Sequence, residues 1–154
     1  MKHILFPVYM AIFTLCLFSC KKDDAVTEVE PITINSAADL NGKWELRFIA
    51  GNIAGGKTFA PGNGNLFIFN NGQYESYKNG QLTIKGVFTI MSDTTVAESV
   101  CLNIKPGAYA NRIVYDGNLT KPKSFFEIRG GKLEFISGCF AGDAGHSETY
   151  ENIK

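Results

Sequence analysis

Apolar and polar residues alternate along most of the chain after residue 41. Trp44, Leu46 and Phe48 share one parity, and charged residues stand between them. A period of two is typical of β-strands with one buried face and one face toward solvent. No stretch of this region shows a convincing helical period. The pattern therefore predicts an all-β domain whose strands direct every second side chain into a core.

Turn-forming residues separate the predicted strands. Residues 70–72, 79–80 and 130–131 read Asn-Asn-Gly, Asn-Gly and Gly-Gly, and these residues favour the positive φ angles that tight hairpin turns require. The strands joined in this way are short and antiparallel. They are expected at residues 43–48, 66–69, 73–78, 81–90, 100–105, 112–115, 125–129, 132–137 and 148–153.

The folded region, residues 39–154, has the length of a single domain. Closure of a sheet removes exposed strand edges, so a single antiparallel up-and-down barrel of about 8–9 strands is the expected architecture. A two-sheet sandwich is the alternative. The longer loops, residues 51–64 and 93–99, are expected to form part of a mouth or a lid.

The first 19 residues have the plan of an export signal. A basic start, Met1-Lys2-His3, precedes an uncharged run at residues 4–18. This run is shorter than the roughly 20 apolar residues of a membrane-spanning helix, so a transmembrane anchor is the weaker interpretation. Residues 17–20, Leu-Phe-Ser-Cys, resemble the lipobox of bacterial lipoproteins. The resemblance implies that residues 1–19 are removed and that Cys20 is acylated.

The segment after Cys20 indicates where such a lipoprotein would reside. Residues 21–24, Lys-Lys-Asp-Asp, resemble the export signal that sends lipoproteins of Bacteroidota to the outer face of the outer membrane. Residues 20–38 would then be the acylated cysteine and a flexible polar linker. The expected protein is anchored in the outer membrane by its N-terminal lipid and faces the cell exterior.

Charge argues against nucleic acid as a partner. The chain has 15 basic and 15 acidic residues, and removal of Lys2 with the signal leaves 14 against 15, a net charge of −1. Phosphate recognition needs clustered Lys and Arg, whereas these residues are scattered here. No nucleic-acid partner is expected.

Two cysteines remain for the folded domain once Cys16 has left with the signal and Cys20 carries lipid. In an exported protein, Cys101 and Cys139 are a candidate disulfide. Cys101 points away from the apolar face of its predicted strand and Cys139 lies on that face, so the bond needs a bulge, which Gly138 could provide. Two separate half-buried thiols are the alternative.

Two catalytic patterns occur in unsuitable settings. Residues 51–58 satisfy the P-loop pattern, but Pro61 and neighbouring glycines exclude the helix that phosphate binding requires, so no nucleotide is expected. Asp143, His146 and Ser147 are the residue types of a hydrolase triad, yet they lie within one predicted loop. His146 is also the last histidine once His3 is removed. The protein is therefore expected not to be an enzyme, and no metal or cofactor is expected.

Several segments in order resemble the lipocalin-like domains of Bacteroidota lipoproteins. They are residues 40–46 (LNGKWEL), 67–74 (FIFNNGQY), 86–90 (GVFTI), 132–136 (KLEFI) and 148–151 (ETYE). The resemblance implies that Gly42 and Trp44 stand at one end of the barrel, where the indole is a structural plug.

The expected function is non-enzymatic binding by an envelope-anchored barrel, with a small apolar molecule as the candidate ligand. The alternative is a filled barrel that presents its loops to another envelope or host protein, whose identity the sequence does not indicate. The candidate cavity or core residues are Leu46, Phe48, Phe67, Phe69, Tyr74, Phe88, Tyr115, Phe126 and Phe135.

Overall fold

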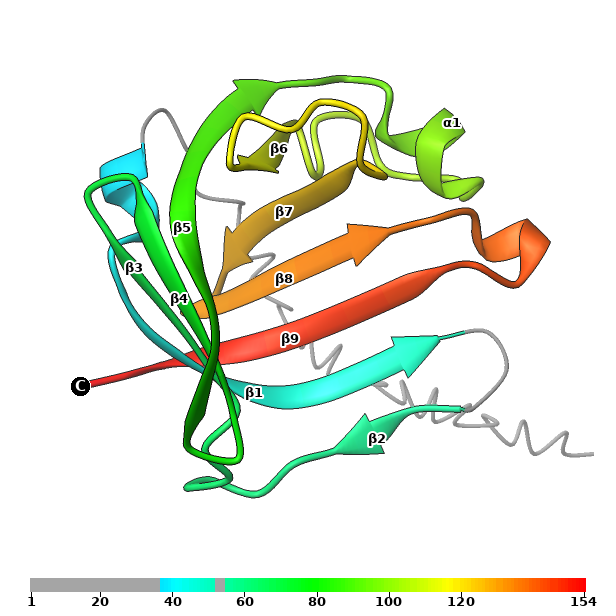
Figure 1. Cartoon of the computed structure of the whole chain (residues 1–154). Helices are drawn as coiled ribbons and strands as arrows, with labels where there is room; N and C mark the ends of the chain where they lie inside the picture. The colour runs from blue at the N-terminus through cyan, green and yellow to red at the C-terminus, as the bar shows by residue number, and fades with distance from the viewer. Residues whose placement is uncertain (1–36, 52–54) are drawn as a thin grey trace, which may run out of the picture.

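Antiparallel strands make up most of the chain that the structure, a computed structural model, describes (Figure 1). The described residues are 37–51 and 55–154, so the predicted signal, Cys20 and most of the predicted linker lie outside them. Two 3-10 helices, η1 (Ala37–Leu40) and η2 (Phe140–Gly142), and one short helix, α1 (Val96–Val100), accompany the strands. The strands are β1 (Gly42–Gly51), β2 (Lys57–Thr58), β3 (Leu66–Asn70), β4 (Gln73–Lys78), β5 (Gln81–Ser92), β6 (Asn111–Tyr115), β7 (Ser124–Arg129), β8 (Lys132–Ser137) and β9 (His146–Ile153).

Pairing between the first and last strands closes the sheet into a barrel. The strand order is β2-β1-β3-β4-β5-β6-β7-β8-β9, and β1 also pairs with β9. Eight strands form the closed barrel, and β2 is an additional strand beside the end of β1. The predicted all-β, up-and-down barrel is therefore confirmed, and the sandwich alternative is wrong.

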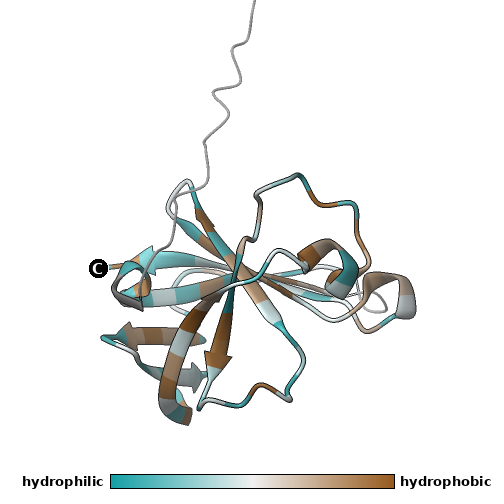
Figure 2. Ribbon diagram, turned by 90° about the horizontal axis from the view of Figure 1, so that it is seen from above, coloured by the Kyte–Doolittle hydropathy of each residue, from teal (hydrophilic) through white to brown (hydrophobic). Residues whose placement is uncertain are grey.

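The predicted hairpin turns adopt the backbone conformation that their residues favour. Asn71 and Gly72 have φ angles of 47° and 82°, and Asn79 and Gly80 have φ angles of 51° and 79°. Two successive residues with positive φ match the right-handed twist of the flanking strands. These turns set the register between neighbouring strands. Hydrophobic and hydrophilic positions alternate along the strands, as the ribbons in Figure 2 show.

A β-bulge in β1 changes which side chains face the interior. The pairing of β1 with β9 shifts register between Leu46 and Phe48, which leaves Arg47 as the extra residue. Leu46 is 5% exposed inside the barrel, whereas Phe48 is 36% exposed on the outer surface. The next residue, Ile49, packs against the core instead. The prediction that Phe48 belongs to the interior is therefore wrong, because the bulge reverses the parity of the strand after Leu46.

The segment between β5 and β6 covers the barrel wall. A strand was expected at residues 100–105, but the chain forms α1 and then turns at Cys101, whose φ angle is 57°. Val96 and Val100 of α1 pack with Phe125 and Ile136 on the outer face of β7 and β8. Figure 1 shows α1 beside this wall. Residues 93–99 therefore do not form the mouth or lid that their length suggested.

Asp93 fixes the start of this segment. Its carboxylate accepts hydrogen bonds from the backbone N–H of Thr95 at 3.0 Å and the hydroxyl of Thr95 at 2.7 Å. Lys123 Nζ lies 2.9 Å from the same carboxylate. Although burial alone raises the pKa of Asp93, the hydrogen bonds from Lys123 and Thr95 outweigh it and lower the pKa to about 2. The residue therefore stays charged at neutral pH.

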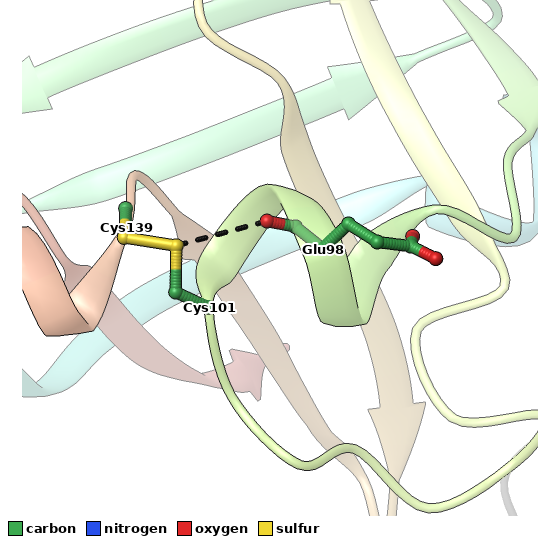
Figure 3. Close-up of a disulfide and its surroundings, with 3 residues drawn as sticks. All are labelled: Glu98, Cys101 and Cys139. Atoms are coloured by element: carbon green, nitrogen blue, oxygen red, sulfur yellow. Dashed lines mark hydrogen bonds between the residues drawn. A yellow bond between two sulfur atoms is a disulfide. The ribbon is translucent and has the colours of Figure 1, made fainter.

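Cys101 and Cys139, the candidate disulfide pair, are bonded in the structure (Figure 3). Neither cysteine lies in a strand, so the parity mismatch expected from the sequence does not arise. Gly138 turns the chain directly after β8 with a φ angle of 67°, and a Cβ at this position would clash with the carbonyl oxygen of Ala144. The bond ties the end of α1 to the loop between β8 and β9.

Candidate functional site

One end of the barrel is sealed. The helix η1 packs against β3 and β5, and Leu40 is completely buried. Trp44 is 4% exposed, and its indole N–H donates to the carbonyl oxygen of Leu40 at 2.9 Å. Gly42 has a φ angle of 143°, which L side chains rarely adopt, and a Cβ there would lie 2.7 Å from Nδ2 of Asn152. Gly42 and Trp44 thus stand where the chain enters the barrel, and the indole fills that end.

Aromatic rings from opposite walls meet halfway along the interior. Phe67 on β3 is central, since its ring centroid lies 5.4 Å from those of Phe69 and Tyr150, 6.0 Å from that of Phe135 and 6.5 Å from that of Tyr115. These partners come from β3, β6, β8 and β9. Because ring pairs at such distances pack favourably, the aromatic layer forms a floor above the sealed end.

Most of the predicted interior residues take part in this core. Among the predicted interior residues, those with exposed fractions of 5% or less are Leu46, Phe69, Tyr74, Phe88, Phe126 and Phe135. Phe67 and Tyr115 pack against the same cluster and are only partly buried. Of the two neighbouring rings on β7, Phe126 faces inward, and Phe125 packs outside beneath α1.

The inward-facing side chains beyond the aromatic floor remain partly exposed. Ile49 of β1 lies opposite Glu148 of β9, which also pairs with Phe135 of β8. Ile49, Glu148 and His146 are of intermediate exposure, as are the floor residues Phe67 and Tyr115. We call this region, where β1 and β8 end and β9 begins, the open end of the barrel. Side chains are thus fully buried at the sealed end and partly exposed at the open end.

A carboxylate projects into the open end. Glu148 Oε2 accepts a hydrogen bond from the hydroxyl of Tyr150 at 2.9 Å, and its Oε1 lies 3.1 Å from Nε2 of His146. The side chains of Glu148 and His146 are 25% and 45% exposed. Burial, and then the charge of Glu148, raises the pKa of both Tyr115 and Tyr150. Both phenols therefore remain protonated, and Tyr150 is a hydrogen-bond donor at neutral pH.

The residues of the apparent hydrolase triad are not brought together. His146 and Ser147 belong to β9 rather than to a loop, and they point to opposite faces of that strand. Asp143 lies in the turn after η2. The hydrogen-bonded partner of His146 is Glu148, which the sequence pattern assigned only to the start of a terminal strand.

The glycine-rich segment forms part of the sheet. Lys57 and Thr58 make up β2, which pairs with Phe48 and Ile49, so no helix begins after these glycines. The ammonium of Lys57 lies over the ring of Phe59, at 4.9 Å from its centroid.

Glu45 anchors the loop that follows β2. Alternation placed this side chain on a solvent-facing surface, yet it is 4% exposed. Its carboxylate accepts hydrogen bonds from the backbone N–H groups of Gly62 at 3.0 Å and Gly64 at 3.3 Å, and from Arg47 at 2.6 Å. Burial raises the pKa of Glu45, but these hydrogen bonds together outweigh burial and hold it below its usual value. The prediction that the side chain of Glu45 faces solvent is therefore wrong.

Among the hollows on the outer surface of the described residues, two bear on function. One, of about 280 Å³, is apolar and lies between β1, β8 and β9 on one side and the segment after α1 on the other. Phe48, Leu102, Ile104 and Phe140 contribute to its lining, and Phe135 and Glu148 border it from the barrel wall. The other, of about 550 Å³, lies over β3, β4 and β5 and mixes apolar with charged side chains.

The fold of this chain is compatible with a known barrel type, but comparisons with known proteins found no match. Within residues 37–51 and 55–154, no three His, Cys, Asp or Glu side chains converge as metal ligands, and none of the helices has the length and apolar character to cross a bilayer. The closed eight-strand barrel is compatible with a lipocalin-like fold. Searches of protein-family models, curated proteins and solved structures found no match to this chain.

Proposed function

We propose that this protein is an envelope-anchored lipoprotein with a lipocalin-like barrel that binds a small, largely apolar molecule at its open end and catalyses no reaction. One observation carries the proposal: Ile49 and the floor residues Phe67 and Tyr115 face inward and stay partly exposed, whereas the sealed end is fully packed. Binding sites for small molecules are concave and mainly apolar, with a few polar groups that orient the ligand. The Glu148–Tyr150 hydrogen bond supplies such polar groups.

Binding without catalysis suits the chemistry of the open end. A nucleophile, a base and an orienting group would have to converge for acyl transfer. Here the inward polar groups, Glu148, Tyr150 and His146, hydrogen-bond one another on a single strand. They can orient a ligand, which is the role proposed for them.

Native mass spectrometry of the full-length protein purified from its own host tests ligand binding. We expect a retained small molecule in the wild type and its loss in Ile49→Trp, because the larger side chain would occupy the open end. Thr149→Trp is the matched control, since Thr149 lies on the outer face of the neighbouring strand and lines the outer apolar hollow. A retained mass that survives Ile49→Trp would contradict binding at the open end.

The outer apolar hollow supports a second candidate function, an interaction module that contacts another envelope or host protein. Phe48 and Leu102 are 36% and 40% exposed beside this hollow. Loss of a retained molecule in Thr149→Trp but not in Ile49→Trp would favour this outer surface. A protein that crosslinks at Leu102 and carries no small molecule would favour it as well.

The proposed anchor predicts a change of location on substitution of Cys20, which lies outside the described residues. Acyl chains contribute about 0.8 kcal/mol for each buried methylene, so two or more hold a protein stably. We expect Cys20→Ala to abolish labelling by radioactive palmitate and to release the protein from the membrane fraction. Cys16→Ala is the control and should keep both properties. Unchanged membrane association of Cys20→Ala would contradict the anchor.

A further inference from the structure

The open end holds the carboxylate of Glu148, whose hydrogen-bond partners are a histidine and a phenol. Among the described residues, the ion-pair partner of Glu148 is His146, whose side chain is 45% exposed and is charged only when protonated. Its other partner is a neutral phenol, Tyr150. The open end thus presents a carboxylate on its inward face.

Aromatic rings surround this carboxylate. Glu148 lies opposite Phe135 in the sheet and is separated from Tyr150 by one residue along β9. The rings of Phe135 and Tyr150 pack edge to face with centroids 6.1 Å apart. Phe67 and Tyr115 complete the floor beneath it. A carboxylate next to aromatic rings favours an ammonium group, because the carboxylate attracts the cation directly and a ring face can attract it as well. The same surroundings repel a ligand carboxylate.

We infer, building on the proposed function, that the open end selects apolar amines over apolar acids of the same length and that Glu148 is the residue that selects them. The ammonium group would lie at Glu148, and the hydrocarbon would lie against Phe67 and Ile49. The lone pairs of the Glu148 carboxylate that Tyr150 and His146 do not use accept the N–H donors of the ligand.

Three ligands with one tail test this inference by isothermal titration calorimetry on the full-length protein. The ligands are octylammonium, octanol and octanoate at pH 7.5. We expect octylammonium to bind about tenfold more tightly than octanoate, with octanol between them, because the carboxylate of Glu148 attracts the cation and repels the anion. This comparison uses the wild type alone and does not depend on the folding of a variant.

Substitutions separate the charge of Glu148 from its structural role. Glu148→Gln keeps the size of the side chain and should weaken octylammonium binding about tenfold while leaving octanol unchanged. Tyr150→Phe removes the hydroxyl that Glu148 binds and keeps the charge, so it should preserve the preference for the amine. Glu98→Gln, on the exposed surface of α1, is the control of equal charge change.

The outcomes distinguish this inference from the function on which it depends. If octanol binds and the amine and acid bind equally, the amine preference is wrong and ligand binding stands. The inference is also wrong if Tyr150→Phe and Glu148→Gln both lose octylammonium affinity tenfold. The carboxylate would then act only through the phenol. If none of the three ligands binds, the proposed function and the inference both fail.

Discussion

Trp44→Ala is expected to lower the free energy of unfolding by about 3–5 kcal/mol, the range for removal of a large aromatic side chain from a core. The indole is 4% exposed, and its N–H satisfies the carbonyl of Leu40. The substitution would leave a cavity at the sealed end and an unpaired carbonyl beneath η1. Urea denaturation followed by circular dichroism measures the loss, and Trp44→Phe should recover part of it.

Phe48→Ala provides a matched control on the same strand. Phe48 is 36% exposed on the outer face, so its truncation should cost only about 1 kcal/mol. Simple alternation would place Trp44 and Phe48 on one face and predict similar losses. Equal destabilisation by the two substitutions would therefore contradict the bulge at Arg47.

Loss of the Cys101–Cys139 bond is expected to destabilise the domain by about 4 kcal/mol, because the bond closes a loop between residues 38 apart and restricts the unfolded chain. The double variant Cys101→Ser with Cys139→Ser measures this loss in urea. Hydrogen exchange should also accelerate in α1, which the bond holds against Phe125 and Ile136.

Reduction of the wild type supplies the control for this experiment. A reducing agent should bring the stability of the wild type to that of the double variant and leave the double variant unchanged. Identical unfolding midpoints for the oxidised and reduced wild type would contradict a stabilising role for the bond.

Alternation and turn residues were sufficient to predict most of the barrel. Both signals are local: a strand with one buried face repeats every two residues, and Asn-Gly or Gly-Gly marks the tight turn that follows. Residues 100–105 do not form the expected strand, although that prediction used the same apolar spacing as the correct ones. Val100 is the last residue of α1 and packs with Phe125 and Ile136, and Ile104 packs against the same cluster, so their apolar spacing arises from a helix end and a loop.

The errors within correctly predicted strands have another origin. A bulge depends on how β1 aligns with β9, which lies about a hundred residues away, and no local pattern in β1 shows the extra residue at Arg47. Burial of Glu45 depends on the amides of Gly62 and Gly64, which reach it through a loop. Local periodicity contains neither of these contacts.

The candidate site was only partly visible in the sequence. Phe67 and Tyr115 were recognisable as aromatic strand residues, whereas Glu148 resembled any polar residue at the start of a strand. Extending the parity of Tyr150 backwards would have placed Glu148 and His146 inside the barrel. The small residues of the preceding loop obscured where β9 begins, so that signal was missed.

The two-residue strand β2 bears on how copies of this protein can associate. It stands at the end of the strand order and covers the side of β1 at Phe48 and Ile49. A long unpaired edge offers backbone groups to which another chain can add a strand, and short edges that carry lysine discourage this. The outer edge of β2 presents only Lys57 and Thr58. Neighbouring molecules crowded on one surface would therefore gain little by joining their sheets.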